Sequence, residues 1–204
     1  DKAIEAFGEA IARDSILRDA HLYRARAYLR KGEPLLARKD LEAEVKILES
    51  YAALTELGEV MLMVSDYENA LAKFDRAIQI DPDKYPAYIG RARAYRLQAM
   101  ATGVAAAKKD ELFQKVEKDL QFVLNKNSKL REAIIEAGRY LSGRGMYSEA
   151  KEHFKGVIDS LTEAMEKEGA AFKDADRVLL VEAYIGRGEA SLNNGENNQA
   201  QADF

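Results

Sequence analysis

The sequence contains no cysteine and only two histidines among its 204 residues. Without cysteine the chain can form neither disulfide bonds nor thiolate metal sites. The histidines, His21 and His153, are far apart in the sequence, and a single imidazole has no metal-binding spacing. We therefore expect no metal site and no cofactor, and we interpret both histidines as packing residues.

Long apolar runs and an excess of positive charge are also missing. No stretch approaches the about 20 apolar residues that a membrane-spanning helix needs. The net charge is -4 with both signs interspersed, so there is no basic stripe of the kind that nucleic acid requires. We expect a soluble protein of the cytoplasm or the bacterial periplasm that neither inserts into a membrane nor binds nucleic acid.

Catalytic motifs are absent as well. Two glycine-rich stretches, Gly143-Arg144-Gly145 and Gly186-Arg187-Gly188, do not follow a strand and fit no phosphate-binding pattern. The acidic residues are scattered over helix faces, as solvated charges usually are. The sequence therefore predicts no catalytic residue and a protein that is not an enzyme.

What the chain does contain is a repeating frame. Ala3, Ala37 and Ala70 are separated by 34 and 33 residues. Phe74 follows Ala70 by one helical turn, which places both on one face of a helix. Ala150 and Ala200 hold the same place later in the chain. Twelve residues before Ala37, Ala70, Ala150 and Ala200, where two helices must approach closely, stand the small residues Ala25, Gly58, Gly138 and Gly188. Ala92 is the small residue of a further repeat, which has Val116 where its alanine should be.

The positions five residues before the alanines carry turn residues. Gly32, Gly145 and Gly195 occupy this place and predict a sharp turn between two helices. At the equivalent turn, Ser65 and Glu68 have the spacing of a capping box, which predicts the start of a helix.

This frame of small, aromatic and turn positions resembles the tetratricopeptide repeat, a helix-turn-helix unit of about 34 residues. The resemblance implies an all-α, right-handed α-solenoid whose family serves mainly to bind other proteins. We expect a single array over residues 1–204. Its expected parts are residues 1–17 as the second helix of an incomplete repeat, then 18–50, 51–84, 85–130 with an insertion, 131–180 with an extension, and an incomplete repeat over 181–204.

Two segments break the period, and the frame is cut at both ends. The excess residues lie near 100–110 and 162–177 and are rich in Ala, Lys and Glu, so we predict helix extensions that form two extended helical hairpins. Asp1 begins inside a second helix, and the frame of Phe204 lacks its closing alanine. We therefore expect the chain to be a fragment.

In the family, the first helices of the repeats line a concave groove. The groove positions lie three before, one after and four after the small residue, and the predicted partner-binding residues there are Leu22, Arg26, Ile89, Arg93, Arg96, Ile135, Arg139 and Ile185. Gly90 and Gly186 are expected to open space for a ligand. Alternatively, the isoleucines are buried against the next repeat and the arginines neutralise Glu59 and Glu189.

The sequence therefore predicts a non-catalytic scaffold that binds a peptide or helix of a partner protein in this groove. One alternative is a self-associating module or spacer, a homo-oligomer whose contact elements are the extensions near residues 105–113 and 163–172. Another is a regulatory domain attached to an enzyme elsewhere in the full chain.

Overall fold

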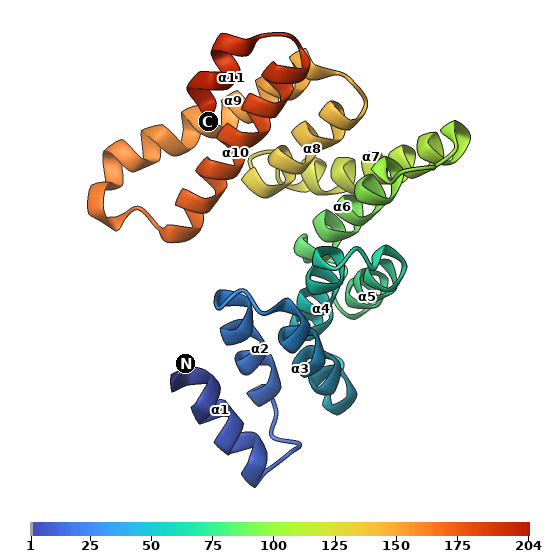
Figure 1. Ribbon diagram of the computed structural model, residues 1–204, viewed down its shortest axis with the longest axis vertical. Helices are drawn as coiled ribbons and strands as arrows, with labels where there is room; N and C mark the ends of the chain where they lie inside the picture. The colour runs from blue at the N-terminus through green and yellow to red at the C-terminus, as the bar shows by residue number, and fades with distance from the viewer. Residues whose placement is uncertain (1) are drawn as a thin grey trace. The chain divides into compact units, whose positions relative to one another are not determined.

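The computed structural model describes residues 2–204, and Asp1 lies outside the described residues. These residues form helices and no strands (Figure 1). The helices are α1 (Lys2–Arg13), α2 (Ala20–Arg30), α3 (Pro34–Ile47), α4 (Tyr51–Met63), α5 (Tyr67–Ile80), α6 (Pro86–Met100), α7 (Ala106–Lys126), α8 (Arg131–Gly143), α9 (Tyr147–Glu168), η1 (Gly169–Ala171), α10 (Asp174–Asn193) and α11 (Asn197–Asp203).

The chain divides into two compact units, one ending at Gln98 and the other beginning at Ala99. Within the first unit α2 packs on α3 and α4 on α5, and within the second α8 packs on α9 and α10 on α11. Each pair consists of a first and a second helix joined by a short turn, as the repeat frame predicts. The all-helical repeat architecture is therefore confirmed, while the single array over the whole chain stays a prediction.

One phenylalanine in each unit explains why the repeat needs small residues. A Cβ atom added at Gly58 would lie 2.7 Å from the ring of Phe74, and one added at Gly90 would also run into this ring. Phe154 fills the space beside Gly186 in the same way. The expectation that Gly90 and Gly186 leave room for a ligand is therefore wrong, because aromatic rings of the preceding second helices occupy that room.

The turns between the paired helices share one backbone conformation. Gly32, Gly145 and Gly195 have φ angles of 79°, 78° and 81°, and Ser65 occupies the same place with φ 59°. Each turn closes with a pair of backbone hydrogen bonds; in the second repeat the amide of Ser65 donates to Leu62 O and the next amide to Met61 O. This is the Schellman pattern, which requires a left-handed residue.

The capping-box prediction at Ser65 is wrong for the same reason. Ser65 is the left-handed residue that ends the turn, so it cannot have the extended conformation of an N-cap. Asp66 is the N-cap of α5 and makes no side-chain capping hydrogen bond to the helix backbone. The repeat frame requires a left-handed residue at this turn, a conformation that glycine adopts readily and that strains the backbone of Ser65.

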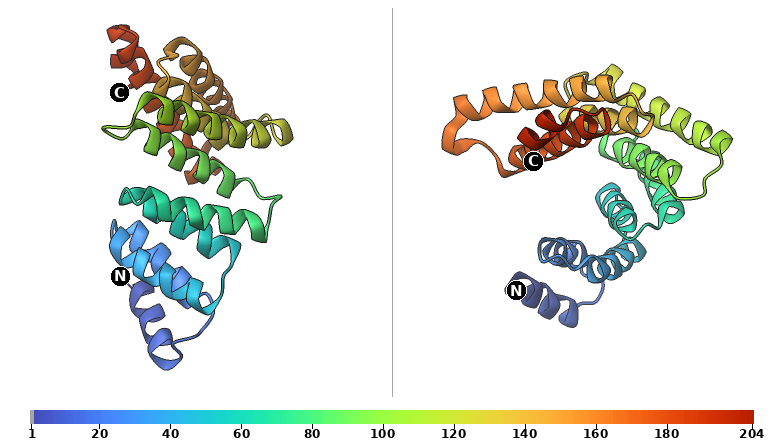
Figure 2. Two further views of the ribbon diagram at one scale, coloured as in Figure 1. Left: turned by 90° about the vertical axis from the view of Figure 1, so that its right-hand side faces the viewer. Right: turned by 45° about the horizontal axis from the view of Figure 1, so that its top comes forward.

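The predicted helix extensions are confirmed. Helix α7 has 21 residues and α9 has 22, compared with 14 residues in each of α3 and α5. In the second unit, α9 and the 20-residue α10 form the arms of a long hairpin, drawn in orange in Figure 2. Helix α10 thus begins at Asp174, inside the segment predicted as an extension.

Each unit has its own hydrophobic core. In the first unit Leu54, Leu57 and Phe74 belong to one buried cluster. In the second unit Phe154 and Leu161 belong to another, to which Phe172, from the connection between α9 and α10, is added. Over the part of the chain that the structure describes, no helix is both long enough and apolar enough to cross a membrane.

Candidate protein-binding surface

The structure separates the four predicted apolar groove residues into two groups. Leu22, Ile89 and Ile135 are buried, whereas Ile185 is 43% exposed. Ile135 of α8 belongs to the same core cluster as Ala183 of α10. Leu22, Ile89 and Ile135 therefore present no exposed apolar stripe, whereas Ile185 remains at the surface.

Two of the predicted groove arginines of the first unit, Arg26 and Arg93, already have acidic partners. Arg26 Nε donates to both carboxylate oxygens of Glu56 at 3.0 Å, and this hydrogen bonding raises the pKa of Arg26. Arg93 donates to Glu59 at 2.7 Å. Arg96 is buried and also engaged. The guanidinium groups of Arg26 and Arg93 link neighbouring first helices, so each of these two would have to leave its carboxylate to bind a partner.

The same kind of link occurs in the second unit. Arg139 of α8 donates to Glu182 of α10 at 3.3 Å, and Arg139 also lies 4.0 Å from the fully buried Glu136. In three repeats the residue after the small residue therefore pairs with the following first helix. In α10 that residue is Glu189, which is exposed and has no ion pair within residues 2–204.

Exposed apolar side chains form a stripe along α10. Val178, Val181, Ile185 and Leu192 are 56%, 57%, 43% and 54% exposed. Their spacing of three, four and seven residues places them on one face of the helix. We call these four residues the α10 stripe.

Only part of this stripe is predictable from the sequence. Ile185 is among the predicted partner-binding residues, and Leu192 stands four residues after the small residue Gly188. Val178 and Val181 follow the segment near 162–177 that breaks the repeat period, and neither occupies one of the three groove positions that the frame defines around Gly188. The helical spacing of Val178, Val181 and Ile185 is the signal that could have found them.

Neither histidine belongs to a catalytic or metal-binding arrangement among the described residues. His21 is buried, as predicted, and its Nδ1 lies 3.3 Å from Asp40, which also accepts two hydrogen bonds from Arg24. His153 lies at the edge of a surface groove in the second unit. No group of three or more potential metal ligands occurs over residues 2–204.

Comparisons with known proteins agree with this architecture. No family model matches the chain. The DnaJ homolog subfamily C member 3 of Rattus norvegicus is 32% identical over 105 residues, which is 52% of this chain and 18% of that protein. The chain therefore matches less than a fifth of the length of this relative.

Two crystal structures resemble most of the chain. A tetratricopeptide protein of Thermus thermophilus superposes with a TM-score of 0.72 and 17% identity, over 90% of this chain and 86% of that one. YrrB, described as a tetratricopeptide protein with an unusual peptide-binding site, has a TM-score of 0.55 and 16% identity over 98% of this chain and 89% of that one. The chain thus has the tetratricopeptide repeat fold, which confirms the resemblance seen in the sequence.

Proposed function

We propose that this chain is a non-catalytic protein-interaction scaffold and that its α10 stripe binds an amphipathic helix of a partner protein. The observation that carries the proposal is the exposure of four aligned apolar side chains on α10. An exposed apolar stripe along one helix is typical of a surface that another helix covers. The peptide-binding site described for YrrB, a protein of the same fold, also supports this class of function.

The preceding repeats indicate what kind of element fits this face. The position three before the small residue is buried in four repeats, at Leu22, Thr55, Ile89 and Ile135, and exposed only at Ile185. Within the second unit, α10 itself packs on α8 and contributes to the cluster that holds Ile135. A helix docked on α10 would repeat this packing, with apolar residues against Val181 and Ile185.

The ion pairs indicate the charge of the docked helix. Arg26, Glu59 and Arg139 each follow a small residue and each pair with an opposite charge on the next first helix. Glu189 holds the same position on α10 without such a partner within residues 2–204. The partner helix should therefore carry a lysine or arginine opposite Glu189, which would orient it along the stripe.

Site-specific photo-crosslinking tests this proposal. A photo-reactive amino acid in place of Val181 should capture one defined partner, and the crosslinked segment should map to an amphipathic helix with a basic residue. The same replacement at Leu35, which is 68% exposed on α3, serves as the control. Equal capture from Leu35 and Val181 would refute the proposal, and capture of a second copy would establish the self-associating module instead.

Affinities of α10 variants for the captured helix then distinguish the contribution of apolar packing from that of charge. The double substitution Val181→Ser and Ile185→Ser should weaken binding by about tenfold or more, because apolar contacts at the centre of an interface dominate its energy. Glu189→Lys should weaken binding less, and a charge-reversed partner helix should restore it. Leu35→Ser should leave the affinity unchanged, and equal affinities for all variants would contradict the proposal.

A further inference from the structure

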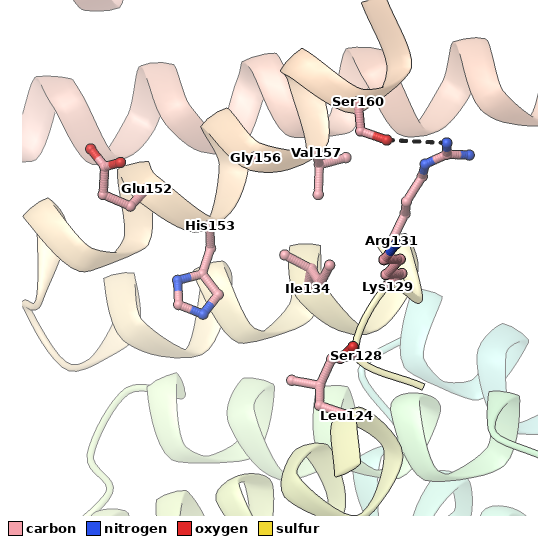
Figure 3. A pocket seen from close by; sticks show the side chains of 10 residues that line it. All are labelled: Leu124, Ser128, Lys129, Arg131, Ile134, Glu152, His153, Gly156, Val157 and Ser160. Atoms are coloured by element: carbon pink, nitrogen blue, oxygen red, sulfur yellow. Dashed lines mark hydrogen bonds between the residues drawn. The ribbon is translucent and has the colours of Figure 1, made fainter. Parts of the chain in front are cut away.

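The second unit carries a surface groove of about 750 Å³ that is lined by α7, α8, α9 and the connection between α7 and α8, with no residue of the α10 stripe in its lining. Leu124 of α7, Ile134 of α8 and Val157 of α9 contribute its apolar side chains (Figure 3). Val157 is buried and the other two are half-buried. We call this cavity the α7–α9 groove.

Gly156 gives the groove its open side. It lies inside α9 and is exposed, and a Cβ atom added there would meet no atom within 4 Å. By contrast, Gly138 in the neighbouring α8 is needed for packing, since a Cβ there would lie 2.8 Å from Phe154. Glycine inside a helix costs about 1 kcal/mol relative to alanine, and no packing contact at Gly156 offsets that cost. Because Gly156 has no side chain, the helix backbone is accessible along the groove.

Charged groups of opposite sign lie at the two ends of the groove. Lys129 and Arg131 stand at one end, and Glu152 stands at the other, beside the imidazole of His153 (Figure 3). Arg131 is held by Ser160 at 3.2 Å and by Asp176 at 3.3 Å. Lys129 and Glu152 have no ion pair among the described residues.

The histidine adds a directed polar group. His153 Nδ1 lies 3.0 Å from the carbonyl oxygen of Glu149, which can only accept, so Nδ1 carries the hydrogen. In the neutral imidazole Nε2 is then an acceptor, with no hydrogen-bond partner within residues 2–204. A ligand donor, such as a backbone N–H, can fill this position.

We propose that the α7–α9 groove is a second binding site, which takes a short extended peptide of a partner protein with an apolar residue followed by Asp or Glu. The apolar side chain packs on Ile134 and Val157 while the peptide backbone passes Gly156. The carboxylate pairs with Lys129, and a backbone N–H donates to His153 Nε2. Opposite charges at the two ends fix the direction of the peptide.

A peptide fits this groove better than a small metabolite or a nucleic acid. Lys129, Glu152, Gly156 and Ser160 are all exposed, whereas sites for small molecules enclose most of the ligand surface. Glu152 at one end and the net charge of -4 disfavour a polyanion.

Amide chemical shifts of the whole 204-residue chain provide the test, with three ten-residue peptide probes that are identical except for a central Leu-Glu, Leu-Lys or Ser-Glu pair. The Leu-Glu probe should shift the amides of Gly156, Val157 and Ser160 and bind with a dissociation constant of about 1 mM or lower. The other two probes should bind about tenfold more weakly. Absence of shifts at these amides with the Leu-Glu probe would overturn the proposal.

Two substitutions make the test specific. Gly156→Leu should fill the groove and weaken binding about tenfold or more while leaving thermal stability unchanged or higher, since its Cβ meets open space. Lys129→Glu should weaken binding of the Leu-Glu probe and strengthen binding of the Leu-Lys probe. Unchanged affinity in Gly156→Leu would refute the site.

Matched controls separate this site from its surroundings and from the α10 stripe. Lys155→Glu removes an exposed lysine of α9 that lies 4.0 Å from Asp159, and it should leave probe binding unchanged. The double substitution Val181→Ser and Ile185→Ser should also retain probe binding. If it abolished the Leu-Glu shifts, the peptide would bind at the α10 stripe and the α7–α9 groove would not be a separate site.

Discussion

At the scale of single residues, Ser65 departs most clearly from the pattern that surrounds it. Four turns of the chain use a left-handed residue five positions before the second-helix alanine, and three of them have glycine there. The fourth has Ser65 with φ 59°. A side chain in this conformation costs about 1–2 kcal/mol, which glycine avoids.

Ser65→Gly should therefore stabilise the protein by about 0.5–1 kcal/mol, the relief of strain less the larger unfolded-state entropy of glycine. The reverse exchange, Gly145→Ser, should destabilise by a similar amount, because a Cβ at Gly145 meets no atom within 4 Å and only backbone strain changes. Denaturant midpoints at a constant m-value measure both effects. A loss of stability in Ser65→Gly would show that the serine hydroxyl contributes more than the strain costs.

At the scale of elements, the turn before α11 is fastened to α9 by an ion pair. Lys151 Nζ donates to Glu196 Oε2 at 2.6 Å, and Asn194 donates to the other carboxylate oxygen at 2.7 Å. These hydrogen bonds, first that of Lys151 and then that of Asn194, hold the pKa of Glu196 below its usual value of 4.5. The pair joins residues 45 positions apart, so it connects two repeats of the second unit.

This lowered pKa has a testable consequence for pH dependence. Because the folded pKa lies below the unfolded one, the stabilisation by Glu196 is present above pH 4.5 and is lost as the pH falls through the folded pKa. The carboxyl carbon of Glu196, followed by nuclear magnetic resonance, should titrate below pH 4.5, and Lys151→Met should move its midpoint upward. Lys155→Met should not move it, since that lysine faces Asp159; an equal shift in both variants would assign the effect to general charge.

At the scale of the whole molecule, each unit has one buried phenylalanine that packs between glycines of neighbouring helices. Phe74 fills the space beside Gly58 and Gly90 in the first unit, and Phe154 fills the space beside Gly138 and Gly186 in the second. Both rings are fully buried. In repeat proteins each repeat is stabilised mainly by its neighbours, so the loss of one ring should act locally.

We expect each of two substitutions, Phe74→Ala and Phe154→Ala, to lower the free energy of unfolding by about 3–5 kcal/mol. The two losses should affect different parts of the chain. Amide hydrogen exchange should accelerate most in α4, α5 and α6 for the first variant and in α8, α9 and α10 for the second. Equal acceleration along the whole chain in both variants would mean that the two units unfold as one.

The sequence by itself determined the repeat frame, the helix pairs, the turn positions and the two helix extensions. These features depend on local chemistry: small residues beside Phe74 and Phe154, left-handed glycines at the turns, and the spacing of apolar positions along a helix. Such constraints act within a few turns of the chain, so they can be read without knowing what each helix packs against.

Only the tertiary structure decided which of the predicted groove residues remain at the surface. Leu22, Ile89 and Ile135 have the same repeat position as Ile185, yet the first three are buried and Ile185 is exposed. Their sequence positions are equivalent, and the difference lies in whether another helix covers them. The α7–α9 groove could not be predicted from the sequence either. Its lining comes from three helices and the connection between α7 and α8, and their packing, rather than any local pattern, leaves the space beside Gly156 open.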